Sequence, residues 1–148
     1  MSKDKYNLER FLTAQERDYD QALQEIRSGR KRSHWMWYIF PQLKDLGYSS
    51  TAKYYGIRDL DEAEAYMAHQ VLCERLIEIS EALLYLKTDD PEHVFGYPDN
   101  LKLRSCMTLF VNTDTDEPVF NNVLEKFFNG QPDERTLDLI CHYENRKK

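Results

Sequence analysis

The sequence contains few residues that interrupt regular structure: 148 residues include only 5 glycines and 5 prolines. No internal repeat, low-complexity tract or linker is visible, and the few glycines and prolines fall at plausible ends of helices. The 3 cysteines, Cys73, Cys106 and Cys141, lie far apart and form no CxxC pair. That pattern argues against a disulfide framework and a structural zinc site, so we expect each cysteine to pack as a small apolar residue. A catalytic thiol at Cys106 or Cys141 is the alternative.

Long apolar runs and familiar chemical motifs are also missing. No run approaches the roughly 20 residues that span a bilayer, and the first residues lack the apolar stretch of a signal peptide. We therefore expect a soluble, cytoplasmic protein without a membrane partner. The sequence contains no GxGxxG, GxxxxGK[ST] or GxSxG motif, and His69 and His93 are isolated. Neither a metal site nor a cofactor is predicted.

Positive charge is outnumbered by negative charge overall but is locally dense. The chain has 20 Lys and Arg against 26 Asp and Glu, a net charge of −6. This balance disfavours nucleic acid as a partner. Four cations nevertheless fall within six residues: Arg27, Arg30, Lys31 and Arg32. A short positive patch on an acidic protein suits a small anion better than a long polyanion.

What is present is helical periodicity along nearly the whole chain. The length fits one domain, residues 1–148, and we predict an all-α array of about seven or eight helices. The strongest apolar stripe is made by Leu72, Leu76, Ile79, Leu83 and Leu86. The predicted helices span about residues 7–28, 33–40, 49–56, 59–69, 70–87, 99–112, 116–129 and 133–144, with a short turn after Pro91. The β-branched and aromatic segment 107–111, MTLFV, could instead form a strand, but it has no convincing partner strand.

The most unusual segment is RSGRKRSHWMWYIFPQ, residues 27–42. If Ser33 caps a helix, the amides that follow it are unpaired, and the positive end of the helix dipole lies beside Lys31 and Arg32. Unpaired amides and cations at a helix start form a phosphate or carboxylate site. His34 in the first turn would be the acid–base group of any catalysis.

Further ligand contacts would come from the same segment and from a second cluster. An indole of Trp35 or Trp37, or the ring of Tyr38, could stack on a base or sugar ring, and Gln42 could orient the ligand. In KLRSCMT, residues 102–108, the functional interpretation adds a cation to the anion site and predicts three more contacts: Lys102, Arg104 and Ser105. The alternative is that the aromatic run is core, the cations are solvated, and Ser105 and Thr108 bond to carbonyls of their own helix.

Several stretches carry a family resemblance over nearly the whole chain: residues 10–49, AKYYGI, EAEAYMAH, KLRSCMTLF and FFNGQPDERTLDLI. The sequence resembles an uncharacterised bacterial family, a numbered domain of unknown function sometimes labelled calpastatin-like. The resemblance implies a compact multi-helical domain and brings no catalytic residues with it. The calpastatin label fits poorly, because the inhibitory segments of calpastatin are disordered until bound.

Two functions follow as hypotheses. The first is a small-ligand binding protein or enzyme that takes a phosphate-bearing metabolite or nucleotide-like molecule at the start of the His34 helix. The second is an interaction module without catalysis, in which tyrosines supply contact surface. The sequence does not determine the oligomeric state.

Overall fold

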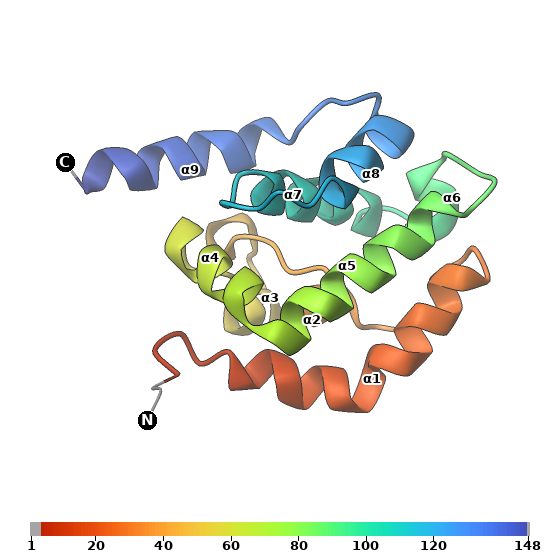
Figure 1. The fold of residues 1–148 in the computed structure, drawn as a ribbon, viewed down its shortest axis with the longest axis horizontal. Coiled ribbons are helices and arrows are strands. Elements are labelled where there is room, and N and C mark those ends of the chain that lie inside the picture. The colour runs from red at the N-terminus through yellow and green to blue at the C-terminus, as the bar shows by residue number, and fades with distance from the viewer. Residues whose placement is uncertain (1–3, 148) are drawn as a thin grey trace.

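The computed structural model describes residues 4–147, and within that range it contains nine α-helices, one 3₁₀ helix and no strand (Figure 1). The predicted all-α class is confirmed. The additional helix is α6, which the sequence predicted as a short turn, and segment 107–111 is the last part of α7. The helices are α1 (Glu9–Arg27), α2 (Met36–Ile39), η1 (Lys44–Leu46), α3 (Ser50–Tyr55), α4 (Leu60–Ala68), α5 (Gln70–Leu84), α6 (Pro91–Phe95), α7 (Asp99–Val111), α8 (Val119–Phe128) and α9 (Glu134–Arg146).

Helix α5 lies in the middle of the array, between α1 on one side and α8 on the other (Figure 1). Helix α7 packs against α8, and α9 covers α7. The predicted stripe of α5 faces this core, with Leu72, Leu76, Ile79 and Leu83 each at most 1% exposed. A spacing of three and four residues places these four side chains on one face of the helix, which explains their joint burial.

Side-chain caps define several helix starts, mostly where the sequence predicts them. Ser49 caps α3, Asp59 caps α4, Asp90 caps α6 and Asp133 caps α9, each by accepting a hydrogen bond from a backbone amide in the first turn. The first helix begins at Glu9 rather than at residue 7, and the Asp4 carboxylate accepts hydrogen bonds from the amides of Leu8 and Glu9 at its start.

The aromatic run 35–40 lies mostly in the core. Trp35, Met36, Tyr38, Ile39 and Phe40 are buried, and Trp37 is half-buried. After Pro41 the chain turns back and runs beside residues 56–58. An isolated parallel bridge joins Leu43 to Ile57, with the Lys44 amide 2.8 Å from the Ile57 carbonyl oxygen. This bridge fixes the connector before η1 against the segment between α3 and α4.

Among the helices of residues 4–147, none has both the length and the apolar character needed to cross a membrane.

Candidate functional site

The predicted helix start at Ser33 is wrong. Helix α2 begins at Met36, its N-cap is Trp35, and it has 4 residues. Ser33 and His34 therefore lie in the irregular segment before the helix. So short a helix adds little dipole, because the macrodipole sums over aligned peptide units.

The sequence assigned the amides that follow Ser33 to an external anion, but the amides of Arg32 and Ser33 just before them bind a carboxylate of the protein. Glu25 Oε1 accepts hydrogen bonds from the backbone amides of Arg32 and Ser33, at 2.7 Å and 3.0 Å, and from Trp35 Nε1 at 2.9 Å. Glu25 Oε2 accepts from Ser33 Oγ at 2.7 Å and from Gln21 Nε2 at 3.0 Å. The local chemistry is that of an anion site, and the anion is Glu25.

These bonds keep Glu25 ionised although the residue is only 8% exposed. Burial alone raises the pKa of its carboxyl group, but the hydrogen bonds from Ser33, the Arg32 amide, Gln21 and Trp35 together outweigh burial and lower the pKa to about 2. An external phosphate or carboxylate at these amides would have to displace a charged, well-bonded side chain.

The predicted cations Lys31 and Lys102 do come together, on a carboxylate. Lys31 Nζ lies 2.9 Å from Asp99 Oδ2, and Lys102 Nζ lies 3.5 Å from Asp99 Oδ1. Lys31 also lies over the Trp35 ring, and Lys102 over the Trp37 ring, at 5.0 Å and 5.3 Å from the ring centroids. The Lys31 side chain is 7% exposed, so its positive charge is paired with Asp99 inside the protein and is not presented at the surface.

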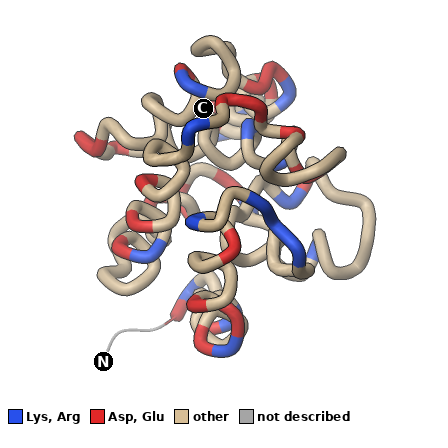
Figure 2. The backbone as a smooth tube through the Cα atoms, turned by 90° about the vertical axis from the view of Figure 1, so that its right-hand side faces the viewer, with Lys and Arg blue, Asp and Glu red and all other residues tan. Residues whose placement is uncertain are grey.

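The remaining residues of the segment are divided between surface and core. Arg30, Arg32 and His34 are exposed, and Figure 2 shows the consecutive cations of residues 30–32 as an unbroken blue stretch of the backbone. The Tyr38 hydroxyl donates to the Asp18 carboxylate of α1, and its pKa rises to about 12 through burial and this bond. Gln42 is half-buried, and its carbonyl oxygen accepts from the Ile57 amide.

The second predicted cluster has structural roles in this structure. Ser105 Oγ donates to the Leu101 carbonyl and Thr108 Oγ1 to the Arg104 carbonyl, at 3.2 Å and 2.8 Å. These are the bonds to the helix's own carbonyls that the alternative interpretation predicted. Arg104 Nε donates to the Gln131 carbonyl and so fastens the segment between α8 and α9. The ligand-binding roles of Arg104 and Ser105 stay predictions.

The cysteines are free thiols with different surroundings. Cys106 is completely buried, and burial raises the pKa of its thiol well above the ordinary value, which disfavours the thiolate. Cys141 is exposed on α9, and its neighbour His142 is stacked at an angle against Tyr143, 6.3 Å between ring centroids. The described residues include no group of three or more His, Cys, Asp or Glu placed to hold a metal ion.

A different cavity is positively charged. It has a volume of about 340 Å³ and lies where the loop before α1 meets the end of α3 and the start of α4. Its charged lining residues are Lys5, Arg10, Lys44, Lys53, Arg58 and Glu62. Five cations thus surround one carboxylate, in a protein whose net charge is negative. We call this cavity the cationic pocket.

Arg10 holds the walls of the cationic pocket together. Its side chain donates to the carbonyls of Tyr6, Asn7, Tyr54 and Gly56 at distances of 2.7 to 3.0 Å. Its fifth donor contacts Glu62 Oε2 at 2.7 Å. A guanidinium has five N–H donors, so all of them have a partner. Arg10 is therefore a structural cation, and it joins three segments of the chain.

Close backbone contact fixes the opposite wall. Gly56 lies so near Lys44 that a Cβ atom at position 56 would stand 2.4 Å from Lys44 Cα and 2.9 Å from the Ala52 carbonyl oxygen. The position requires glycine for space, since its φ of −61° is open to any residue. Together with the Leu43–Ile57 bridge, this contact places Lys44 and Arg58 on the same cavity.

Most of the other cations of the cationic pocket are not neutralised by a carboxylate. Glu62 is committed to Arg10 and to the Arg58 amide, and the Arg58 side chain contacts Asp59 at 3.4 Å. Among residues 4–147, Lys5, Lys44 and Lys53 form no ion pair within 4.0 Å. All three are exposed, so water and salt screen them until a ligand excludes the water.

Two tyrosines add flat apolar surface to the cationic pocket. Tyr6 is half-buried, and the Arg58 guanidinium lies over its ring at 4.9 Å from the centroid. Tyr54 is 57% exposed and lies edge-on to Tyr55 at 4.8 Å between centroids. Ring surface beside unneutralised cations is the combination that recognises a ring bearing a phosphate.

These features define an all-helical domain with a cationic pocket built between its N-terminal loop, α3 and α4. The chain belongs to the family described as "Protein of unknown function (DUF1810)", whose model matches residues 5–140. The chain is also similar to the crystal structure of the conserved hypothetical protein Rv1873 from Mycobacterium tuberculosis. The sequences are 43% identical over 93% of this chain and 99% of that one, with a TM-score of 0.91. A comparison with curated proteins gives no significant match.

Proposed function

We propose that this protein binds a small phosphate-bearing ligand in the cationic pocket. One observation carries the proposal: five cations line the pocket against one carboxylate, and that carboxylate is already bonded to Arg10. A cavity with surplus positive charge is stabilised by a bound anion, and its electric field also speeds the approach of one.

The lining residues suggest how such a ligand would lie. Lys44 and Lys53 supply compact charges for phosphate oxygens, and Arg58 can add a forked pair of donors. The exposed ring of Tyr54 can stack on a base or sugar. Arg10 would not contact the ligand directly, because its donors already have partners. A nucleotide or sugar phosphate therefore suits the pocket better than inorganic phosphate alone.

The His34 segment remains the alternative location for the ligand. Binding there would use Arg32, Ser33 and a ring of the aromatic run, with His34 as the acid–base group, and it would require Glu25 to leave the amides that it now occupies. We propose binding and assign no reaction. We keep the cytoplasm as the expected compartment, since phosphorylated metabolites are abundant there.

Thermal-shift scans against nucleotides, dinucleotides, ADP-ribose and sugar phosphates test this proposal. A ligand at about 100 times its dissociation constant stabilises the folded state by roughly 2.7 kcal/mol. The double variant Lys44→Ala/Lys53→Ala should lose that shift, whereas the matched double variant Arg32→Ala/His34→Ala should keep it. The reverse pattern would place the ligand at the His34 segment, and a panel without any shift would favour the interaction module.

A further inference from the structure

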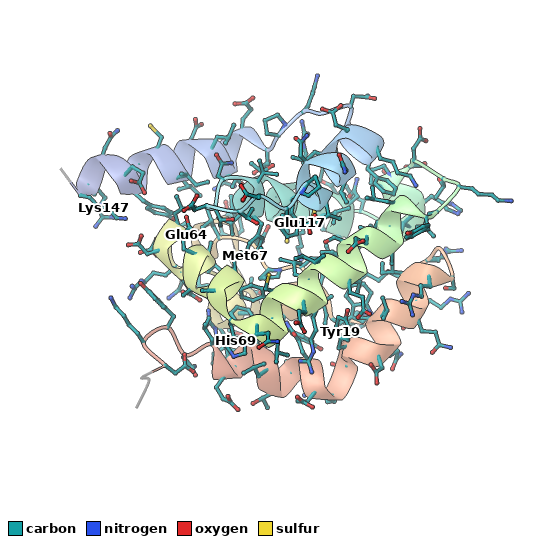
Figure 3. The ribbon with its side chains drawn as sticks, viewed as in Figure 1. Tyr19, Glu64, Met67, His69, Glu117 and Lys147 are labelled. Atoms are coloured by element: carbon teal, nitrogen blue, oxygen red, sulfur yellow. The ribbon has the colours of Figure 1, made fainter. Side chains whose placement is uncertain are left out.

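The surface between α1 and α5 carries a long groove that shares no lining residue with the cationic pocket. Figure 1 shows the two helices side by side, and Figure 3 shows Tyr19 of α1 in the space between them. Two hollows of about 610 Å³ and 460 Å³ lie along this line, and both are lined by Glu74 and Glu78. Shared lining residues make the two hollows one continuous feature, which we call the α1–α5 groove.

The larger hollow has apolar lining residues that are partly exposed. They are Tyr85, which is 86% exposed, Ile77 and Leu86, which are half-buried, and Ala82, which is buried. Ile77 lies on α5 and Tyr85 is the C-cap residue of that helix, and both lie outside the buried stripe of Leu76, Ile79 and Leu83. Exposed apolar surface rimmed by charge is characteristic of interaction sites.

The rim of the α1–α5 groove is acidic. Its carboxylates are Glu16, Asp20, Glu74, Glu78 and Glu81, and its cations are Arg27 and Arg75. Arg75 is paired with Glu16 at 3.3 Å. Among residues 4–147, Asp20, Glu74, Glu78 and Glu81 have no ion-pair partner within 4.0 Å. Their negative charge is thus available to a partner.

We infer that the α1–α5 groove docks a basic amphipathic segment of a partner protein. Apolar side chains of that segment would contact Ile77, Tyr85 and Leu86, and its lysines or arginines would meet the carboxylates along both rims. An amphipathic helix that binds in a groove makes apolar contacts with one face and polar contacts with its flanks. The charge complementarity excludes the phosphate-bearing ligands proposed for the cationic pocket, which the acidic rim would repel.

A second copy of this chain fits the groove less well. The protein carries a net charge of −6, so two copies repel each other on average. The chain has two runs of three consecutive cations. Residues 30–32 include Lys31, which is buried against Asp99, and residues 146–148 include Lys147, which pairs with Asp61 and Glu144. A separate basic segment meets neither obstacle. The occupant is therefore assigned to another protein.

The test uses a fluorescently labelled synthetic peptide of 18 residues, with leucine at helical positions i, i+3, i+4 and i+7 and lysine elsewhere. A matched peptide carries glutamate in place of every lysine. Fluorescence anisotropy with the full chain should show that the lysine peptide binds and that the glutamate peptide does not. Raising the salt concentration should weaken the binding, since the rim contributes through charge.

Three variants locate the binding site. Glu81→Lys and Tyr85→Ala change exposed groove residues and should each weaken the peptide at least tenfold, whereas Asp138→Lys, an exposed position on α9, should change affinity less than twofold. Circular dichroism checks that each variant is folded. Absence of binding, equal binding of the two peptides, or equal effects of Glu81→Lys and Asp138→Lys would overturn the inference. So would a dimer in light scattering that Tyr85→Ala dissociates, because the groove would then be a self-interface.

Discussion

The Arg10 guanidinium and the Glu62 carboxylate meet 2.7 Å apart in the interior, where their side chains are 6% and 3% exposed. The two residues come from different helices, α1 and α4, and lie 52 positions apart in the sequence. Arg10 also binds four carbonyls, so the pair anchors the wall of the cationic pocket.

Breaking this pair should be costly. Glu62→Gln removes the negative partner of a buried cation, and we expect the free energy of unfolding to fall by about 3–5 kcal/mol. Arg10→Met should cost at least as much, because four carbonyls then lose their donor as well. Urea unfolding at pH 7 measures both. A loss below about 1 kcal/mol for either variant would contradict the anchoring role.

Glu25 should make stability depend on pH. Its folded-state pKa, about 2, lies below the ordinary 4.5. Its contribution is therefore fully present above about pH 4.5, and it is lost as the pH falls from 4.5 through 2. A lowering of this size corresponds to a contribution on the order of 3 kcal/mol. Urea unfolding of the wild type and of Glu25→Gln should show a gap of about 2–3 kcal/mol at pH 7 that narrows towards pH 2; a constant gap would speak against the assignment.

Gly56→Ala should destabilise the protein through a clash rather than through backbone strain. The new Cβ would meet Lys44 Cα and the Ala52 carbonyl oxygen, both backbone atoms that cannot rotate away. Overpacking of this kind typically costs about 1–3 kcal/mol. Thermal unfolding measures the loss, with Thr51→Ala at an exposed position of α3 as the control. The variant should also weaken any ligand of the cationic pocket, since Lys44 must shift.

Lys126 should stabilise the end of α5. Its Nζ donates to the carbonyls of Leu83, Leu84 and Leu86, the last turn and the residues that follow it. Bonds to a charged donor contribute about 1.5–3 kcal/mol, so Lys126→Met should lower the free energy of unfolding by about that amount. Lys87→Met, a neighbouring exposed lysine, should have an effect below about 0.5 kcal/mol. Equal losses of unfolding free energy for the two variants would show that the removal of one positive charge, and not of the three hydrogen bonds, accounts for the effect.

The helices could be predicted because each is encoded by neighbours in sequence. The apolar stripe of α5 and the helix starts near residues 49, 59 and 133 are local patterns, and the structure confirms them. The start of α2 was predicted wrongly for a tertiary reason. The chain reverses at Gly29, with φ at +92°, and returns residues 32 and 33 to the end of α1. There the Glu25 carboxylate accepts hydrogen bonds from the amides of Arg32 and Ser33, so Ser33 does not act as the N-cap of a helix.

The cationic pocket gave no signal in the sequence. Lys5, Lys44, Lys53 and Arg58 lie on separate segments, and no motif or spacing relates them. Their proximity depends on the Arg10 bonds and on the Leu43–Ile57 bridge, both of which are long-range contacts. Glu62 lies in the first turn of α4, where acidic residues are common, and no sequence pattern marks its burial against Arg10.

The five bonds of Arg10 have a consequence for motion. One side chain ties the loop before α1, the end of α3 and the start of α4, so a displacement of Arg10 breaks its bonds to all three segments together. Such a unit opens all at once or not at all. The cationic pocket is then a rigid, preformed binding site. Its backbone amides should exchange their hydrogens with solvent in a single cooperative event. A ligand would bind without first having to order the walls of the pocket.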